Sequence, residues 1–396
     1  MTFDGMWSAI EPVGRHAETG GYRRYAWTRE DATMREWFAG EAAARGLDLV
    51  TDRAGNQWAW WGDPDAAVVA GRPGVVVGSH LDSVPDGGAF DGPLGVVSAL
   101  AAVDVLRDRG FAPSRPIAVA SLIDEEGARF GVACAGSRLI TGGLDADTAR
   151  GLRDADGVTM AEAMTAAGHA TEHVGPDAET LRRIGTFVEL HVEQGRGLVD
   201  LGRPVAVGSA IWPHGRWRID LDGEANHAGT TRLEDRHDPM LALATTVLAA
   251  RAAATAQGCV ATVGKVAVEP NGVNAIPSRV TAWLDARGPG EAGVRAVVEA
   301  VGRQSGSMAV EESWTSGTAF DVPLSRRLSG LLDDAPMLAT AAGHDAGVFA
   351  GAGVSAAMLF VRNPTGISHS PAEFAEREDC HRGVEALTRV IEELAR

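Results

Sequence analysis

The sequence predicts an α/β protein of two domains, one of them inserted into the other. Apolar runs that end in polar or glycine-bearing loops, such as 75–77, 117–123 and 355–361, are typical of buried strands. A length of 396 residues exceeds what one typical hydrophobic core fills. Between about 210 and 320 the expected elements follow the order β-α-β-β-α-β, a self-contained split βαβ unit. We therefore expect residues 1–209 and 322–396 to form one domain and residues 210–321 to form the inserted one.

The other elements follow from apolar spacing taken in chain order. Helical spacing of Met34, Trp37 and Phe38 predicts a helix that packs on the core. The remaining expected helices are 94–106, much of 144–184, 238–257, 291–304, 326–343 and 375–395. The remaining expected strands are 56–62, 186–192, 216–221, 259–268, 278–286 and 308–314.

Composition excludes several classes of partner. The formal net charge of −17 argues against nucleic acid and anionic membranes, because both are bound through basic patches. The first residues show no basic region followed by an apolar core, and no run approaches the ~20 apolar residues of a membrane helix. The cysteines, Cys134, Cys259 and Cys380, are odd in number and far apart, so neither disulfides nor a thiolate zinc site is expected. We predict a cytoplasmic protein.

Polar side chains follow the apolar run 75–77 and precede a helix. His80, Asp82 and Asp91 lie in this loop, and in open α/β sheets ligands bind at the carboxyl ends of strands. A histidine nitrogen can bind a metal with Asp82 behind it as the supporting carboxylate, while Asp91 can bridge two cations. The alternative is an ordinary turn, in which aspartate and glycine are common.

Adjacent carboxylates follow the next apolar strand without a break. Glu125 and Glu126 come just after residues 117–123, and one could ligate metal while the other acts as a general base. The alternative for such a pair is a surface acidic cluster.

Two further histidines lie at expected strand ends. Alternation along the strand near residue 190 places Glu189, His191 and Glu193 on one face and apolar residues on the other. His369 lies in a turn-rich loop after residues 355–361. Both histidines are candidate ligands, because a metal-type loop already stands at a neighbouring strand end.

Five segments resemble the amidase, hydantoinase/carbamoylase family: GSHLDSVPDGGAFDGPLGV, DEEGARFG, ELHVEQG, GEANHAGTTRLEDRHDP and GISHSPAE. This family contains N-carbamoyl-L-amino-acid amidohydrolases, β-ureidopropionases and allantoate amidohydrolases. The resemblance covers essentially the whole chain. It implies a mixed-sheet metallopeptidase-like catalytic domain and an inserted, ferredoxin-like lid domain that also forms the interface of a homodimer.

The resemblance also implies a set of metal ligands. Two divalent ions per subunit, zinc, manganese, cobalt or nickel, would be bridged by Asp91. His80 and His191 would complete one site, Glu126 and His369 the other, and Glu125 would be the general base. His191 stands where peptidase relatives commonly carry a carboxylate, which favours the carbamoylase branch.

Substrate contacts are implied in the same way. They are Gln194 and the lid residues Arg216, His227, Asn274 and Arg287. The planar fork of Arg287 suits a substrate carboxylate, and His227 could donate a hydrogen bond to the developing oxyanion. Whether the lid residues serve their own subunit or its partner stays open.

Other residues keep a structural alternative or depart from the family. His344 matches the family pattern without a decided role, and Arg236 could form a structural ion pair. Arg232 replaces a common proline, and Arg362 and Trp212 also depart from the expected pattern, which leaves the substrate open.

The activity implied is metal-dependent hydrolysis of a linear ureido C–N bond in an N-carbamoyl-L-amino acid, β-ureidopropionate or allantoate. The alternative is an aminoacylase or dipeptidase with the same metals. Metal identity and the extent of lid closure stay open.

Overall fold

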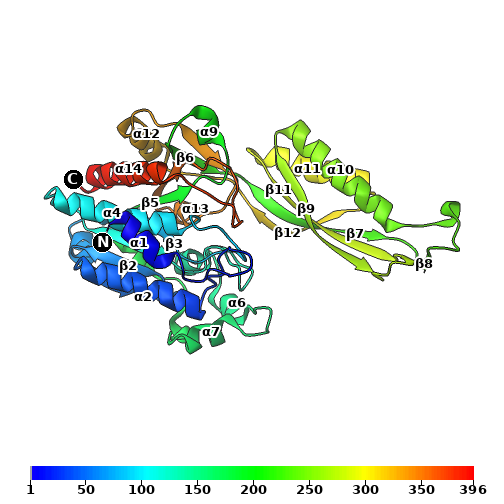
Figure 1. The fold of residues 1–396 in the computed structure, drawn as a ribbon, viewed down its shortest axis with the longest axis horizontal. Coiled ribbons are helices and arrows are strands. Elements are labelled where there is room, and N and C mark those ends of the chain that lie inside the picture. Colours follow the sequence, from blue (N-terminus) through cyan, green and yellow to red (C-terminus); the bar gives the residue numbers. More distant parts are fainter. Residues whose placement is uncertain (1) are drawn as a thin grey trace. The chain divides into compact units, whose positions relative to one another are not determined.

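The computed structural model describes residues 2–396 and divides into two units. Unit 1 comprises Met1–Ser209 and Ala319–Arg396, and unit 2 comprises Ala210–Thr318 (Figure 1). Each unit has its own hydrophobic core.

Unit 1 is built on a nine-stranded mixed sheet with the order β1-β2-β4-β3-β5-β15-β6-β13, in which β14 also pairs with β6. The central strands β4, β3, β5 and β15 are parallel, and β1, β2 and β6 add antiparallel neighbours. The mixed α/β architecture is therefore confirmed. The strands are β1 Asp48–Thr51, β2 Gln57–Trp61, β3 Gly74–His80, β4 Ile117–Leu122, β5 Ile184–Val192, β6 Val205–Ile211, β13 Thr318–Ala319, β14 Met337–Thr340 and β15 Ser355–Val361.

Helices cover both faces of the parallel strands. Every residue of β3 and β4 is buried, as expected of strands whose two faces are both covered. Helices α4 (Pro93–Asp108) and α14 (Arg377–Ala395) pack on one face. Helix α13 (Asp345–Gly351) packs on the other, where the rings of Phe349 and Phe187 are 4.6 Å apart. The other helices of unit 1 are α1 Phe3–Ile10, α2 Arg29–Ala44, α3 Pro64–Val69, α5 Ala135–Thr141, α6 Ala146–Gly151, α7 Met160–Ala166, α8 Ala178–Arg183, α9 Gly197–Leu201 and α12 Val322–Leu331, with a 3-10 turn at Thr171–His173.

The expected pattern of β5 is partly wrong. Glu189 and His191 do share a face, but Phe187 lies on it as well and α13 covers it, so both faces of the strand are buried. Glu193 lies beyond the strand, where its carboxylate accepts the N–H groups of Gly197 and Leu198 at the start of α9. A parallel strand with helices on both faces of its sheet has no solvent-facing side, which is why the alternation misleads there.

The segment 326–343 is helical only in its first part. After α12 the chain turns through Asp333 and Asp334, both with positive φ, and then forms β14, which pairs with β6. The strand forms because β6 offers a hydrogen-bonding edge, which local spacing cannot reveal. In the segment 144–184 the expected helical region is three short helices, α6 to α8.

Unit 2 is a four-stranded antiparallel sheet with the order β12-β7-β11-β9, covered on one face by two helices. In chain order these elements are β7 His214–Asp222, α10 Pro239–Gln257, β9 Val260–Glu269, β11 Arg279–Arg287, α11 Glu291–Ser305 and β12 Ala309–Thr315. Alternate residues of β7 and β11, among them Trp217, Ile219 and Val280, face the helices and form the core. A short ladder, β8 Asn226–His227 with β10 Ala275–Ile276, and a 3-10 turn at Leu233–Asp235 complete the unit.

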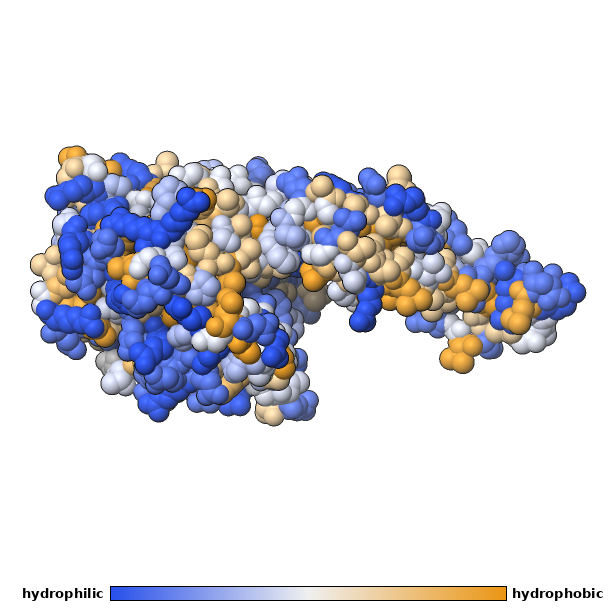
Figure 2. Space-filling model, turned by 90° about the horizontal axis from the view of Figure 1, so that it is seen from above, coloured by the Kyte–Doolittle hydropathy of each residue, from blue (hydrophilic) through white to orange (hydrophobic). Residues whose placement is uncertain are grey.

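Helix α10 is apolar on its exposed side as well as on its buried side. Its buried residues include Thr246, Ala250 and Ala254, whereas Leu241 and Leu248 are each 71% exposed. Apolar residues are visible on the surface of this unit (Figure 2). Helix α10 has a mean hydropathy of 1.3, and by length and composition it is the one helix within residues 2–396 that could cross a membrane. The expectation that no segment comes close to a membrane helix was therefore too strict. Its alanines carry the average, and the helix packs on a sheet, so this is weak evidence for a membrane segment.

Candidate metal centre

The carboxyl ends of four neighbouring strands bring the candidate ligands together. His80 ends β3, His191 lies near the end of β5, Glu126 follows β4 and His369 follows β15, while Asp91 lies in the loop before α4. They form two overlapping groups, His80–Asp91–His191 and Asp91–Glu126–His369, and within each group the ligand atoms lie within 4.8 Å of one another. Asp91 belongs to both groups.

The first group points two imidazole nitrogens at one carboxylate oxygen. The Nε2 atoms of His80 and His191 lie 3.5 and 3.1 Å from Asp91 Oδ1. The Nδ1 atoms of the two rings face the backbone carbonyls of Asp82 and Val192, at 3.2 and 2.9 Å. With Nδ1–H donating to these carbonyls, Nε2 is left as an acceptor that could bind a metal. Within residues 2–396 neither Nε2 has a hydrogen-bond partner although both rings are buried.

The second group is less buried than the first, because the His369 side chain is exposed. His369 Nε2 lies 3.5 Å from Glu126 Oε2 and 3.7 Å from Asp91 Oδ2. Glu126 Oε1 is buried and has no hydrogen-bond partner in the described chain. This buried oxygen beside the Asp91 carboxylate fits a cation, because an unpaired buried polar atom is otherwise costly.

Electrostatics point the same way. Burial disfavours the charged form of His191, but the nearby Asp91 carboxylate outweighs this and raises the pKa of His191 to about 9. Burial and the charge of Asp91 raise the pKa of Glu126 to about 8. Burial works against ionisation of Asp91 too, yet the positive charge of His191 holds its pKa well below the usual value. The cluster therefore attracts positive charge, which protons or metal ions can supply.

Glu125 lies beside the first group without belonging to either group. Its Oε2 atom is 3.7 Å from His80 Nε2, and the Cys134 thiol lies 3.5 Å from Oε1. Burial, reinforced by the charge of Glu126, raises the pKa of Glu125 well above its usual range although His80 opposes the shift. A carboxylate that readily holds a proton is suited to general-base work.

Asp82 does more than support His80. One oxygen lies 3.3 Å from His80 Nδ1, and the carboxylate also accepts the backbone N–H groups of Glu125 and Glu126 at 3.2 and 3.0 Å. The same side chain therefore ties the end of β3 to the carboxylate pair that follows β4.

Gln194 lies against the cluster itself. Its Nε2 atom donates to Asp91 Oδ2 at 2.8 Å and lies 3.3 Å from Ser368 Oγ. Two residues that sequence reasoning missed, Ser368 and Glu373, also contact the Asp91 loop. The available signal was their position in the loop that carries His369.

The other expected substrate contacts form two pairs within unit 2. Arg287 makes a two-pronged ion pair with Asp285 at 2.7 and 3.1 Å, and Arg216 Nε lies 3.5 Å from the same carboxylate. His227 and Asn274 meet at the β8–β10 ladder, where the Ala228 N–H donates to the Asn274 carbonyl.

Two residues with undecided roles are now placed. His344 is buried in unit 1, with its ring 4.6 Å from that of His191. Burial, together with the charge of His191, holds the pKa of His344 well below its usual value. Arg236 donates to the carbonyls of Ala228 and Thr231, and no ion pair of its side chain is found within residues 2–396.

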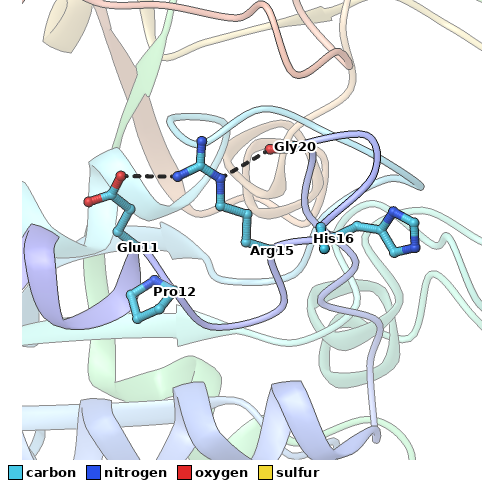
Figure 3. Close-up of a pocket in the computed structure, with 6 residues that line it drawn as sticks. Glu11, Pro12, Arg15, His16 and Gly20 are labelled. Atoms are coloured by element: carbon cyan, nitrogen blue, oxygen red, sulfur yellow. Dashed lines mark hydrogen bonds and ion pairs between the residues drawn. The ribbon is translucent and has the colours of Figure 1, made fainter.

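A surface hollow of about 470 Å³ lies elsewhere in unit 1, lined by residues that include Glu11, Arg15 and His16 (Figure 3). Arg15 pairs with Glu11 and donates to the Gly20 carbonyl. Its lining contains none of the candidate ligands, so we do not take it as the functional site.

A mixed α/β domain with His and Asp groups able to hold metal at its strand ends is the arrangement expected of a metallohydrolase. Residues 76–393 match Peptidase family M20/M25/M40, and the chain belongs to this family. The resemblance inferred from the five segments is confirmed, and the chain is a hydrolase of the amidohydrolase branch.

Full-length relatives belong to this branch. The chain is 35% identical to an N-carbamoyl-L-amino acid amidohydrolase of Geobacillus stearothermophilus, over 98% of both chains. It is 32% identical to the allantoate amidohydrolase of Escherichia coli, over 95% of this chain and 93% of the relative. Its fold matches an amidase of the hydantoinase/carbamoylase family from Burkholderia multivorans with a TM-score of 0.86 and 28% identity, over 99% of this chain and 97% of that one.

Proposed function

We propose that the protein hydrolyses the linear ureido C–N bond of an N-carbamoyl-L-amino acid or of allantoate. The observation that carries this proposal is the pair of groups sharing Asp91, with the carboxylate of Glu125 beside them. The amidohydrolase relatives support the bond type, and both substrates carry a carboxylate next to the ureido group.

The centre would hold two divalent ions, one in each group. Imidazole nitrogens together with carboxylate oxygens suit zinc, manganese, cobalt or nickel. When bound, such ions polarise the substrate carbonyl and make water a stronger nucleophile.

Glu125 would accept a proton from the attacking water and deliver it to the leaving nitrogen as the C–N bond breaks. The first products are ammonia and a carbamate, and the carbamate then loses carbon dioxide to leave the amine. Gln194 would orient the substrate beside Asp91, because its amide donates a hydrogen bond to that carboxylate and so lies at the centre.

Unit 2 would act as the lid. Arg287 would bind the substrate carboxylate with Arg216 beside it, since a guanidinium fork matches two carboxylate oxygens. His227 and Asn274 would donate hydrogen bonds to the reacting carbonyl and the ureido group.

Unit 2 would also form the interface of a homodimer. Leu241 and Leu248 are largely exposed on α10, and β9 is the terminal strand of its sheet. An apolar surface beside an unpaired strand edge is typical of an interface. Replacing both leucines by glutamate is expected to give a monomer in analytical ultracentrifugation, and an unchanged dimer would refute this interface.

A reducing compartment such as the cytoplasm suits the three cysteines, which are free and buried.

The test of the activity is ammonia release by metal-loaded enzyme. The substrates are N-carbamoyl-L-amino acids, N-carbamoyl-β-alanine and allantoate, with N-acetyl amino acids and dipeptides as controls. Ammonia from a ureido substrate supports the proposal, and the ranking of rates names the substrate. Turnover of the acyl or peptide compounds alone would overturn it in favour of an aminoacylase or dipeptidase.

A further inference from the structure

The loop that carries His369 also contacts Asp91, although the two segments are far apart in the sequence. Glu373 Oε1 accepts the backbone N–H groups of Phe90 and Asp91, both at 2.9 Å. Ser368 Oγ lies 3.0 Å from Asp91 Oδ2 and 3.3 Å from Glu373 Oε2. The segment that contains Ser368 and Glu373 therefore contacts both the backbone and the side chain of Asp91. Glu373 is 282 residues away from Asp91 in the chain.

The Asp91 loop is shaped to receive this carboxylate. Glu373 is only 5% exposed, and a Cβ atom at Gly88 would overlap its carboxylate. On the other flank Gly92 has a φ of 84°, and a Cβ there would overlap the His80 ring. The segment from Gly88 to Gly92 is therefore enclosed between Glu373 and a candidate ligand, with no room for larger residues at either end.

We propose that Glu373 is a positioning residue that fixes Asp91 for both groups of candidate ligands, so that the binding of both ions depends on it. This inference rests on the proposed two-ion centre. Asp91 is the one residue common to the two groups, so a shift of its loop alters both. Glu373 belongs to neither group, and it acts through hydrogen bonds to the loop rather than through an ion.

The effect differs from that of removing a ligand. His369 belongs to the second group alone, so its loss should affect one ion. Loss of Glu373 should weaken the binding of both ions, because it leaves two N–H groups of the shared loop without their acceptor. If Glu373 only stabilised the fold, its loss would lower thermal stability and leave the binding of both ions unchanged in the folded protein.

The experiment measures zinc bound per chain during titration with a competing chelator, by elemental analysis, on protein verified as folded by circular dichroism. Glu373→Ala should weaken both ions by about 10- to 100-fold, the range typical for partners of metal-ligating residues. His369→Ala should retain one ion at wild-type affinity. The matched control is Glu376→Ala, an exposed carboxylate three positions away that makes no capping hydrogen bond.

Two further variants keep the test decisive if Glu373→Ala fails to fold. Glu373→Gln keeps an oxygen that can accept both N–H groups, so its zinc binding should stay close to that of the wild type. Gly88→Ala keeps the Glu373 residue but moves its carboxylate, so it should weaken the binding of both ions.

The inference is overturned if Glu373→Ala or Gly88→Ala binds zinc as the wild type does, or if only one ion is weakened. It is also overturned if Glu373→Gln loses zinc as severely as the alanine variant. A wild-type protein that binds fewer than two ions would instead refute the two-ion centre of the proposed function, which separates the two failures.

Discussion

Replacing Asp82 by alanine tests how one buried carboxylate organises the candidate centre. Asp82 is 5% exposed, and its carboxylate accepts the N–H groups of Glu125 and Glu126 while lying 3.3 Å from His80 Nδ1. The substitution leaves two backbone donors without their acceptor. The His80 ring keeps the Asp82 backbone carbonyl but loses the carboxylate.

The magnitude follows from these contacts. Each buried donor left without an acceptor costs about 1–3 kcal/mol, so the metal-free protein should lose about 2–6 kcal/mol of unfolding free energy. Loss of the carboxylate behind a ligating histidine should weaken the adjoining ion by about 10- to 100-fold. The stability loss is a large share of the ~5–15 kcal/mol by which domains are typically stable.

The assay is urea unfolding of the metal-free protein, followed by chelator competition on the zinc-loaded form. Asp82→Asn keeps one oxygen acceptor, so its unfolding free energy should lie between those of the wild type and the alanine variant. Asp108→Ala, at the exposed end of α4, is the matched control. The reasoning is refuted if Asp82→Ala unfolds within about 0.5 kcal/mol of the wild type, the usual range for surface substitutions.

Three other substitutions test separate parts of the structure. Glu125→Gln should keep its zinc content and lower ammonia release by about 10²–10⁴-fold, and near-normal turnover would exclude it as the base. Arg287→Ala should raise KM about 10- to 150-fold for substrates with a carboxylate, and an equal effect on neutral ureido compounds would contradict its role. Gly95→Ala should lower the unfolding free energy by about 1–3 kcal/mol, because its Cβ would overlap the Leu190 carbonyl. The control Gly40→Ala, on an open helix surface, should raise it by about 0.5–1 kcal/mol, and calorimetry that gave both the same sign would contradict this packing.

The main strands of both sheets and several helices could be predicted because their signals are local. The apolar run before His80 and the run 355–361 are long and flanked by turn residues, and both form the expected strands, β3 and β15. Helix α10 begins at Pro239 after the cap Asp238, as its sequence indicates. In these segments burial and local preference agree.

The predictions failed where a neighbouring strand or helix decides the conformation or the burial of a segment. Residues 337–340 become a strand because β6 lies beside them, and no spacing within the segment carries that information. The second face of β5 is buried because α13 covers it, although Glu189 on that face reads as solvent-exposed.

The candidate ligands could be named from the sequence because strand ends in an α/β sheet converge on one edge. What the sequence by itself determined is therefore the α/β class, the family and the residue types that can bind metal. Only the tertiary structure decided how Asp91 is held: its neighbours Gln194, Ser368 and Glu373 come from distant parts of the chain. The physical reason is that a hydrogen bond depends on positions and directions within a few tenths of an ångström, and these are fixed only when sheet, helices and loops pack together.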